Sequence, residues 1–263
     1  EREMLVRLDE MTPPDVEDLV AEVTCDEAVI INPGAVDEEG KSLPRLAAID
    51  CGVKYNILRE LAQRFEVIWF PATTTFDEIL KWKPDAFFAS NGPGDPAHSG
   101  AATTARDSLA AAVRAGLPVM GICLGHQLMG LAAGLRTYKL RYGHRGANQP
   151  VVDLETGRVY ITSQNHGFAV EDPEKGMLAP HPSGACSIRG GNELEAPFKV
   201  RYVNANDRTV EGLDLIGKRA FTIQYHPEAC PGPHDASPLF DRFASMVADH
   251  LAGIPIPTSG GDS

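Results

Sequence analysis

The sequence predicts a doubly wound α/β fold, in which helices cover both faces of a mostly parallel sheet. From residue 46 to residue 135, short apolar runs alternate with segments of helical periodicity. The apolar runs are hydrophobic throughout rather than at every second residue, which is typical of parallel strands buried on both faces. From residue 136 to residue 223 the helical pattern disappears and short β-like runs recur. This second half predicts an antiparallel or mixed edge to the same sheet.

Each predicted element has its own signal. In the segment 54–64, Ile57, Leu58 and Leu61 share one face at helical spacing. A last amphipathic helix is expected at 237–251, with Ser237 as N-cap and Pro238 at the first helical position. The other helices are expected at 75–82, 106–116 and 126–135. The strands are expected at 46–50, 65–70, 85–90 and 117–122, followed by β-like runs at 158–163, 166–170, 199–204, 209–213 and 220–224.

The two ends of the chain lie outside this pattern. Residues 12–23 predict a short helix with Thr12 as N-cap and Pro13 at its first position. The stretch 32–44 is rich in glycine, proline and charge without periodicity, and indicates a linker. We therefore expect a segment at 1–45, the remnant of a further domain with its linker, a main domain at 46–253, and a disordered tail at 254–263.

Composition excludes several classes of function. The 24 basic and 36 acidic residues give a net charge of −12, which disfavours partners such as nucleic acid and anionic membranes. No apolar run is long enough to cross a bilayer, and the charged opening does not resemble a signal peptide. The five cysteines are odd in number and lack C-x-x-C spacing. A cytoplasmic, reducing compartment is therefore expected, and neither a disulfide framework nor a zinc ribbon.

The sharpest chemical motif is GICLG, which lies between an apolar strand and a helix. Cys123 stands at the apex of this turn, and Gly121 and Gly125 leave room for a strained backbone. The N-terminus of the following helix favours a thiolate, and its N–H groups, beginning with that of Leu124, are suited to hold an oxyanion. The alternative is a buried core cysteine, but the paired glycines favour a nucleophile.

A cysteine nucleophile needs a base and a group that orients the base. His226 and Glu228 lie two residues apart at the end of the last predicted strand, where alternation would point both side chains the same way. We predict His226 as the base and Glu228 as its orienting group. Taken alone, the pair would indicate a surface histidine and a solvated glutamate. The pair becomes a candidate catalytic site because the GICLG turn at Cys123 occurs in the same chain.

Two further motifs have both a chemical and a plain interpretation. The loop 90–96 (SNGPGDP) follows a strand and exposes N–H groups suited to an oxyanion or a carboxylate, although alone it would be only a turn. The basic run Lys139, Arg141, His144 and Arg145 could touch an anionic ligand, but a solvated loop is the commoner meaning of such a run. No metal site is expected, because prolines prevent the helix that would align His226, Cys230 and His234.

Taken together, the motifs GICLGHQLMGLAAG, NGPGDP, QNHGF and HPE resemble those of the class I, triad-type glutamine amidotransferases. More narrowly, DCGVKYNILR, YGHRGANQPV, SQNHGFAV and HPEACPGPHDASPLFDRF are similar to segments in the small subunits of glutamine-dependent carbamoyl-phosphate synthetases. The similarity runs from about residue 46 to residue 251. It implies a flavodoxin-like architecture for the main domain.

The resemblance also implies an activity and its residues. Cys123 would attack the side-chain amide of L-glutamine to form a thioester, with His226 as base and then acid, supported by Glu228. Ammonia would pass to a large subunit that uses ATP, magnesium and bicarbonate to make carbamoyl phosphate for pyrimidine and arginine synthesis, so that this chain itself needs no cofactor. The expected glutamine-binding residues are Gly92, Gly94, Leu124, Gln127, Asn165, Gly167 and Phe168.

Some alternatives remain open at this stage. Family members carry a full N-terminal domain, whereas only about 45 residues precede the main domain here. The resemblance also implies a serine in that N-terminal domain that contacts glutamine, and this sequence has no counterpart of it. The chain could instead serve an anthranilate, GMP or CTP type of synthetase, although PGPHDASPLFDRF argues against these. A γ-glutamyl peptidase is a weaker alternative. A catalytically silent regulatory subunit would keep the fold and lose a triad member, and the intact Cys123, His226 and Glu228 argue against it.

Overall fold

The computed structural model describes residues 17–177, 186–187 and 190–256 of the chain. Its helices are α2 (Leu19–Val23), α3 (Tyr55–Ala62), α4 (Phe76–Leu80), α5 (Ala101–Arg114), α6 (Leu124–Ala132) and α7 (Pro238–Leu251). Its strands are β1 (Val29–Ile30), β2 (Arg45–Asp50), β3 (Glu66–Pro71), β4 (Ala86–Ala89), β5 (Val119–Ile122), β6 (Thr137–Asp153), β7 (Val159–Val170), β8 (Phe198–Asn204), β9 (Val210–Leu215) and β10 (Ala220–Ile223).

A single sheet joins all these strands in the order β1-β3-β2-β4-β5-β10-β9-β8-β6-β7. The five strands β3, β2, β4, β5 and β10 are parallel to one another, and their order is that of a flavodoxin-like sheet. The remaining strands pair antiparallel at the two sides. The predicted fold class is confirmed, with a parallel core and an antiparallel extension.

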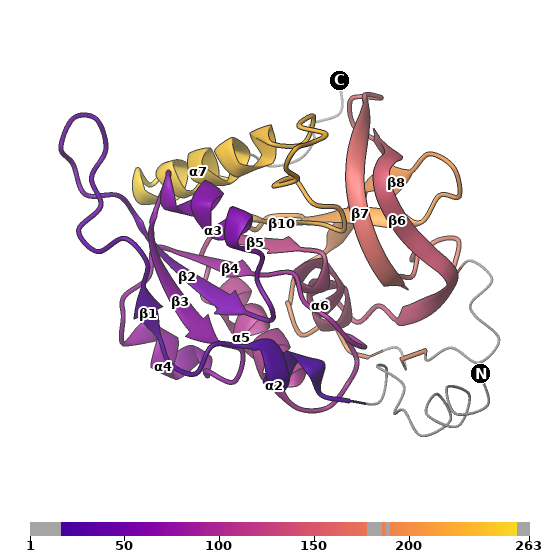
Figure 1. The fold of residues 1–263 in the computed structure, drawn as a ribbon, viewed down its shortest axis with the longest axis horizontal. Helices are drawn as coiled ribbons and strands as arrows, with labels where there is room; N and C mark the ends of the chain where they lie inside the picture. The colour runs from indigo at the N-terminus through magenta and orange to yellow at the C-terminus, as the bar shows by residue number, and fades with distance from the viewer. Residues whose placement is uncertain (1–16, 178–185, 188–189, 257–263) are drawn as a thin grey trace, which may run out of the picture.

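The continuous hydrophobicity of the parallel strands comes from burial on both faces. Along β2, Leu46 and Ala48 belong to the core that includes residues of α3 and α7, whereas Ala47 and Ile49 belong to the core that includes residues of α5 and α6. Figure 1 shows α3 and α7 on one side of the sheet and α4 and α5 on the other. Alternate residues of each strand therefore meet different helices, so that neither face can be polar.

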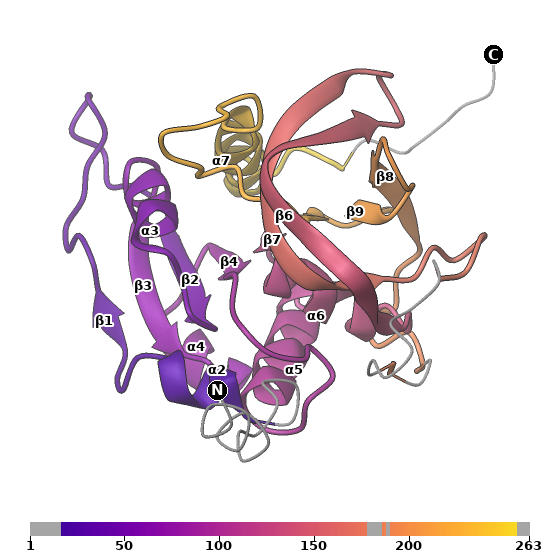
Figure 2. The same ribbon diagram turned by 45° about the vertical axis from the view of Figure 1, so that its right-hand side comes forward.

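The antiparallel extension is dominated by the long pair β6 and β7. β6 has 17 residues and β7 has 12, and their register shifts between Lys139 and His144 and again between Gly146 and Gln149. Such irregularities bend and twist a strand pair. Figure 2 shows this ribbon curving beside the parallel core, over the end of the sheet from which α6 begins. The predicted runs at 158–163 and 166–170 are thus one strand.

The helix expected from Thr12 does not run continuously to residue 23. Thr12 and Pro13 lie outside the described residues, but residues 17 and 18 are not helical and α2 begins only at Leu19. Asp18 is its N-cap, and the Asp18 carboxylate accepts from the N–H of Ala21 at 3.2 Å. The residues before the predicted linker also join the sheet, because β1 pairs with the edge of β3.

Helix α5 begins five residues before its predicted start. Its first residues, AATTA, contain no large apolar side chain to reveal an amphipathic pattern. The N–H of Ala101 is satisfied by the carboxylate of Asp18, 83 positions earlier in the chain. Ser237 and Pro238 occupy the predicted first positions of α7, although the Ser237 side chain makes no capping hydrogen bond. None of the helices in the described ranges is both long and apolar enough to span a membrane.

Candidate active site

The predicted chemical residues meet at one edge of the parallel sheet. Cys123 directly follows β5, His226 follows its parallel neighbour β10, and the loop containing Gly92 and Gly94 follows β4 on the other side. Because parallel strands end at the same edge, these three segments converge even though more than 130 residues separate the first from the last. β7 is attached to this edge by the N–H of His226, which donates to the carbonyl of Ser163 at 2.9 Å.

Cys123 occupies a strained turn between β5 and α6. Its φ and ψ angles are 54° and −99°, and a positive φ is unusual for a residue with a side chain. A Cβ on Gly125 would lie 2.3 Å from the Ala89 carbonyl oxygen, and one on Gly121 would lie 2.8 Å from the Gly125 backbone. The two glycines therefore allow the turn to pack against β4, as the sequence predicts.

The start of α6 directs its N–H groups in different directions. The N–H of Gly125 donates to the Ser90 carbonyl at 3.0 Å, and that of Gln127 donates to the Cys123 carbonyl at 3.2 Å. The hydrogen bonds of the described residues do not use the N–H of Leu124, which is the first residue of the helix. They do not use the N–H of His126 either, so Leu124, directly after Cys123, stays the predicted oxyanion donor.

His226 lies between the sulfur and a carboxylate. Its Nδ1 is 2.7 Å from Glu228 Oε1, and the Cys123 side chain is near enough to affect its pKa. Burial lowers the pKa of His226, but the hydrogen bonds and charges of Cys123 and Glu228 outweigh it and raise that pKa to about 9. The imidazole is therefore held as a cation at neutral pH, ready to give up a proton.

Glu228 is held in its charged form. Burial raises the pKa of this carboxyl, yet the hydrogen bond and charge of His226, together with the charge of Lys54 at 3.4 Å, bring it below the ordinary value. The Asn56 side chain donates to the Glu228 carbonyl at 2.5 Å. One detail of the sequence prediction is wrong: Glu228 lies in a turn after the strand, so a turn and not strand alternation brings it to His226.

A cavity of about 140 Å³ opens beside Cys123. Seven of the predicted residues line it: Gly92, Gly94, Cys123, Gln127, Asn165, Gly167 and Phe168. His226, Glu228 and Leu124 are almost fully buried and are not among its lining residues. The remaining lining residues, which sequence reasoning did not place here, are Pro93, Arg145 and His166. The cavity thus combines loops from β4 and β5 with the β6–β7 ribbon.

Gln127 faces the cavity with one end of its amide. Its Nε2 group donates to the carbonyl of Phe168 at 2.9 Å and to Gln224 Oε1 at 3.0 Å. Both amide hydrogens are therefore used by the protein, and the Gln127 oxygen is the atom that can accept from a ligand. These bonds also fix Phe168, at the end of the β7 segment that lines the cavity.

The basic run 139–145 is not the solvated loop that it first suggests. It lies in β6, where His144 is opposite His166 and Arg145 is opposite Asn165 across the strand pair. The signal that could have placed Arg145 is this pairing: once SQNHGF is assigned to a strand, YGHRGAN is its antiparallel partner. The register between two distant segments is not set by local sequence, so this pairing could not place Arg145 at the cavity from the sequence alone.

His144 anchors a buried polar network behind the cavity. Its Nε2 is 2.8 Å from Asp207 Oδ2, and its Nδ1 is 3.1 Å from Gln164 Oε1 and 3.4 Å from Glu211 Oε1. Burial lowers the pKa of His144, but hydrogen bonds to Asp207 and Glu211 raise it to about 10. His166 has no such compensation, and burial lowers its pKa to about 3.

Among the described residues, the group that could hold a metal ion belongs to this same network. Possible ligand atoms of His144, His166 and Glu211 all lie within 4.8 Å of one another, a grouping that the sequence did not suggest. Each of them already has protein partners, and Gln164 bonds all three. The geometry thus favours a hydrogen-bonded support for the cavity wall.

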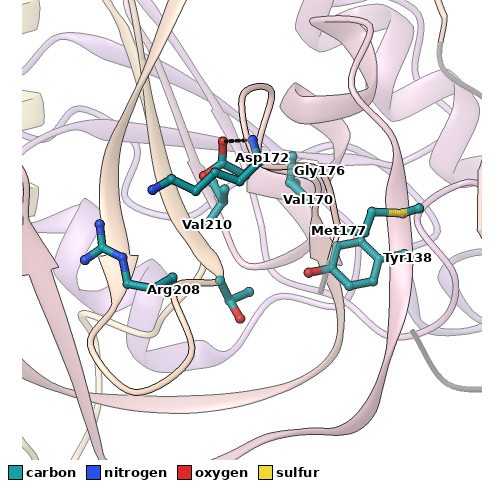
Figure 3. A pocket seen from close by; sticks show the side chains of 9 residues that line it. Tyr138, Val170, Asp172, Gly176, Met177, Arg208 and Val210 are labelled. Atoms are coloured by element: carbon teal, nitrogen blue, oxygen red, sulfur yellow. Dashed lines mark hydrogen bonds between the residues drawn. The ribbon is translucent and has the colours of Figure 1, made fainter. Parts of the chain in front are cut away.

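A second cavity, of about 80 Å³, lies elsewhere, and no triad residue lines it. Figure 3 shows the side chains of Tyr138 and Met177 on one side of it and Arg208 on the other. The Asp172 carboxylate at its edge accepts from the N–H of Lys175 at 3.1 Å. No cysteine or histidine is among its lining residues, so it is not a second site of the same kind as the cavity at Cys123.

Comparison with known proteins agrees with the geometry of this site. Residues 47–246, which include the whole Cys123–His226–Glu228 arrangement, match the family described as glutamine amidotransferase class-I. The chain belongs to this family. The class-I amidotransferase match covers the parallel core and most of the antiparallel extension, which are the parts that build the cavity.

Relatives with the same domain carry a narrower name. The chain is 43% identical over 252 residues to a carbamoyl phosphate synthase small chain of Methanopyrus kandleri, covering 95% of this chain and 61% of the relative. It is 47% identical over 203 residues to the small chain of Methanocaldococcus jannaschii, covering 77% of this chain and 51% of that one. The chain thus spans little more than half the length of these relatives.

A solved structure supports the amidotransferase fold. A putative GMP synthase component from Thermoplasma acidophilum superposes with a TM-score of 0.59 and covers 80% of this chain and 96% of its own. Its sequence is only 16% identical, so the likeness concerns the fold alone.

Proposed function

We propose that this chain hydrolyses L-glutamine to glutamate and ammonia as the glutaminase part of a carbamoyl phosphate synthase small chain. The observation that carries the proposal is the assembled Cys123–His226–Glu228 triad beside a cavity lined by Gln127 and Asn165. A cavity of this size is smaller than the roughly 300–1,000 Å³ of sites for drug-sized ligands, and suits one small amino acid.

The first half of the reaction forms a thioester. The Cys123 sulfur, as a thiolate whose proton His226 holds, attacks the side-chain carbonyl carbon of glutamine, and the carbonyl oxygen becomes an oxyanion that accepts from the Leu124 N–H. The C–N bond then breaks as the His226 imidazolium protonates the leaving nitrogen. Ammonia departs, and the γ-glutamyl thioester remains on Cys123.

The second half releases glutamate. His226, now neutral, takes a proton from water, and the resulting hydroxide attacks the thioester carbonyl. The C–S bond breaks, the sulfur leaves as a thiolate, and the Glu228 carboxylate again stabilises the imidazolium. These steps need only water and the side chains of this chain, and we assign ATP, magnesium and bicarbonate to a large subunit that would receive the ammonia.

The relatives favour this partner over the alternatives. Small-chain relatives match over most of this chain at 43–47% identity, whereas the GMP synthase component resembles it in fold alone. The intact triad argues against a silent regulatory role. We propose a reducing, cytoplasmic setting, since all five cysteines are free and Cys123 must stay reduced to react.

Glutamate release from glutamine, measured with and without a carbamoyl phosphate synthase large chain, tests the proposal. We expect turnover that increases when the large chain is added. Cys123→Ser should lower turnover by at least roughly 10³-fold while leaving ammonia-dependent carbamoyl phosphate synthesis by the complex intact. Cys51→Ser is the matched control, because Cys51 is also buried and also directly follows a parallel strand, β2. Unchanged turnover in Cys123→Ser would disprove the assignment.

A further inference from the structure

Arg145 gives the glutamine cavity its only permanent positive charge among the described residues that line it. His166 is the other lining residue with a basic side chain, and burial keeps it neutral by lowering its pKa to about 3. The same set of lining residues contains no carboxylate. An amino acid substrate carries both an α-carboxylate and an α-ammonium group, so the charge of the wall selects which end faces it.

The backbone fixes one edge of the Arg145 guanidinium. Its Nη1 donates to the Tyr142 carbonyl at 2.5 Å. Gly143 leaves space for the side chain, because a Cβ there would lie 2.7 Å from Nη1. Nη2 lies 3.9 Å from the position a Cβ would take on Gly167, a cavity-lining residue of the neighbouring strand β7. The free edge of the guanidinium is therefore held beside the part of β7 that lines the cavity.

No carboxylate of the described residues lies within 4.0 Å of this guanidinium to neutralise it. Other arginines of the chain contrast with it: Arg136 pairs with Glu171 at 2.8 Å, and Arg242 pairs with Asp214 at 3.0 Å. An arginine fork matches a carboxylate with two parallel hydrogen bonds, and such pairs are among the stronger polar contacts in proteins. The Arg145 guanidinium is therefore able to form such a pair with a carboxylate that enters the cavity.

We infer that Arg145 binds the α-carboxylate of glutamine and so orients its side-chain amide toward Cys123. This inference rests on the proposed function. With the carboxylate at the β6–β7 wall, the amide end of the substrate extends toward the turn at Cys123. The Gln127 oxygen, whose amide hydrogens are already bonded within the protein, is then an acceptor for the α-ammonium group.

Substrate and residue can be changed separately to test this contact. Glutamine and its α-amide differ only in the charge and acceptor capacity of the group that Arg145 would bind. For the wild-type chain with the large chain present, we expect kcat/KM to be about 10- to 100-fold lower for the α-amide, mainly through KM. Arg145→Ala should lose a similar factor for glutamine but little further for the α-amide. Arg145→Lys should recover part of the loss.

Arg141→Ala is the matched control, since Arg141 lies on the same strand and stacks on the Tyr142 ring at 5.4 Å instead of lining the cavity. It should behave as the wild type with both substrates. Equal and additive losses for Arg145→Ala and for the α-amide would overturn the inference, because the two changes would then act independently.

A binding measurement separates failure of this inference from failure of the proposed function. Calorimetry of glutamine and its α-amide with Cys123→Ser, and with Cys123→Ser/Arg145→Ala, needs no turnover. If wild-type turnover is absent but Arg145→Ala abolishes the preference for glutamine in binding, the carboxylate site stands and the glutaminase proposal fails. If turnover is present and Arg145→Ala leaves that preference unchanged, or if neither ligand binds, the inference fails.

Discussion

At the scale of single residues, the site depends on a few atoms that must lie unusually close together. Cys123, between β5 and α6, has a φ of 54°. A Cβ on Gly92 would lie 2.1 Å from the Cys51 carbonyl oxygen, so the loop after β4 can approach the end of β2 only with glycine there. Small residues around the cavity thus reflect backbone contact, whereas its proposed chemistry rests on His226, Glu228 and Arg145.

Glu228→Gln tests how the carboxylate acts on its neighbour. The Glu228 charge helps hold the pKa of His226 at about 9, so its removal should lower that pKa. Since the proposed mechanism needs a protonated His226 to release ammonia, the basic limb of the kcat profile should move to lower pH. At neutral pH, kcat should fall by roughly 10²-fold.

Rates between pH 6 and pH 10 check this prediction, together with NMR titration of the His226 ring. Glu193→Gln is the control, since Glu193 lies far along the chain from the triad and forms a long ion pair with Arg106. A lower kcat with an unchanged basic limb would show that Glu228 acts through packing and not through charge.

At the scale of elements, the β6–β7 ribbon forms one wall of the cavity and needs support from behind. Arg145 and Asn165, paired across the ribbon, line the cavity, whereas His144 and Gln164 contact Glu211 on β9 and His144 also contacts Asp207 in the turn before it. Glu211 is fully buried, and burial raises its pKa despite the bonds from His144, Asn204 and Gln164. A protonated His144 therefore links the wall of the cavity to the strand pair β8–β9.

His144→Gln should destabilise the fold in a pH-dependent way. The pKa of His144 is about 10 in the folded protein against about 6.5 for an ordinary histidine. Its stabilising effect is therefore complete below about pH 6.5 and is lost as pH rises toward 10. Near pH 6, His144→Gln should lower the free energy of unfolding by about 1.5–3 kcal/mol, with a smaller difference near pH 10.

Urea denaturation at pH 6, 8 and 10 measures this effect. His234→Gln is the control, because His234 is exposed and should leave the free energy of unfolding within about 0.5 kcal/mol of the wild type. If the deficit of His144→Gln were the same at all three pH values, the ion pairs of His144 would not be its source.

At the scale of the whole molecule, one carboxylate ties three parts of the chain together. Asp50, at the end of β2, accepts from the N–H groups of Gly52 at 2.9 Å and Val53 at 2.8 Å through Oδ1. Its Oδ2 accepts from the N–H of Cys25 at 2.8 Å. Segment 19–30 is thereby attached to the turn that precedes α3, next to the Lys54 that contacts Glu228.

Replacing Asp50 by alanine or by asparagine should separate these two attachments. Asp50→Ala removes the acceptors of all three N–H groups and should lower the free energy of unfolding by about 2–4 kcal/mol. Asp50→Asn can keep the oxygen that faces Gly52 and Val53 but turns an NH₂ toward Cys25, so it should release the N-terminal segment with a smaller global cost.

Urea denaturation and limited proteolysis within residues 17–31 distinguish the two variants. Asp18→Ala is a milder control, because Asp18 caps α2 and also accepts from Ala101. We expect faster cleavage in both Asp50 variants than in the wild type. Cleavage as slow as in the wild type would mean that the packing of β1 on β3, and not Asp50, holds the segment.

The sequence by itself determined the order of the core elements, the strained turn at Cys123 and the partners His226 and Glu228. Each leaves a local trace: an apolar run of strand length, a helical face such as that of Ile57, Leu58 and Leu61, or two glycines around a cysteine. Burial on both faces and steric exclusion act over a few neighbouring residues, which is why the fold could be predicted and the site residues proposed from local patterns.

Only the tertiary structure decided what lies opposite these residues. The register between β6 and β7 brings Arg145 to the cavity and His144 to Asp207, 63 positions away, and Asp18 starts α5 from 83 positions away. The residue types at such positions are compatible with a solvated loop as well as with a site. Their roles follow from contacts between distant segments, and those contacts are set by how the whole sheet closes and not by any local pattern.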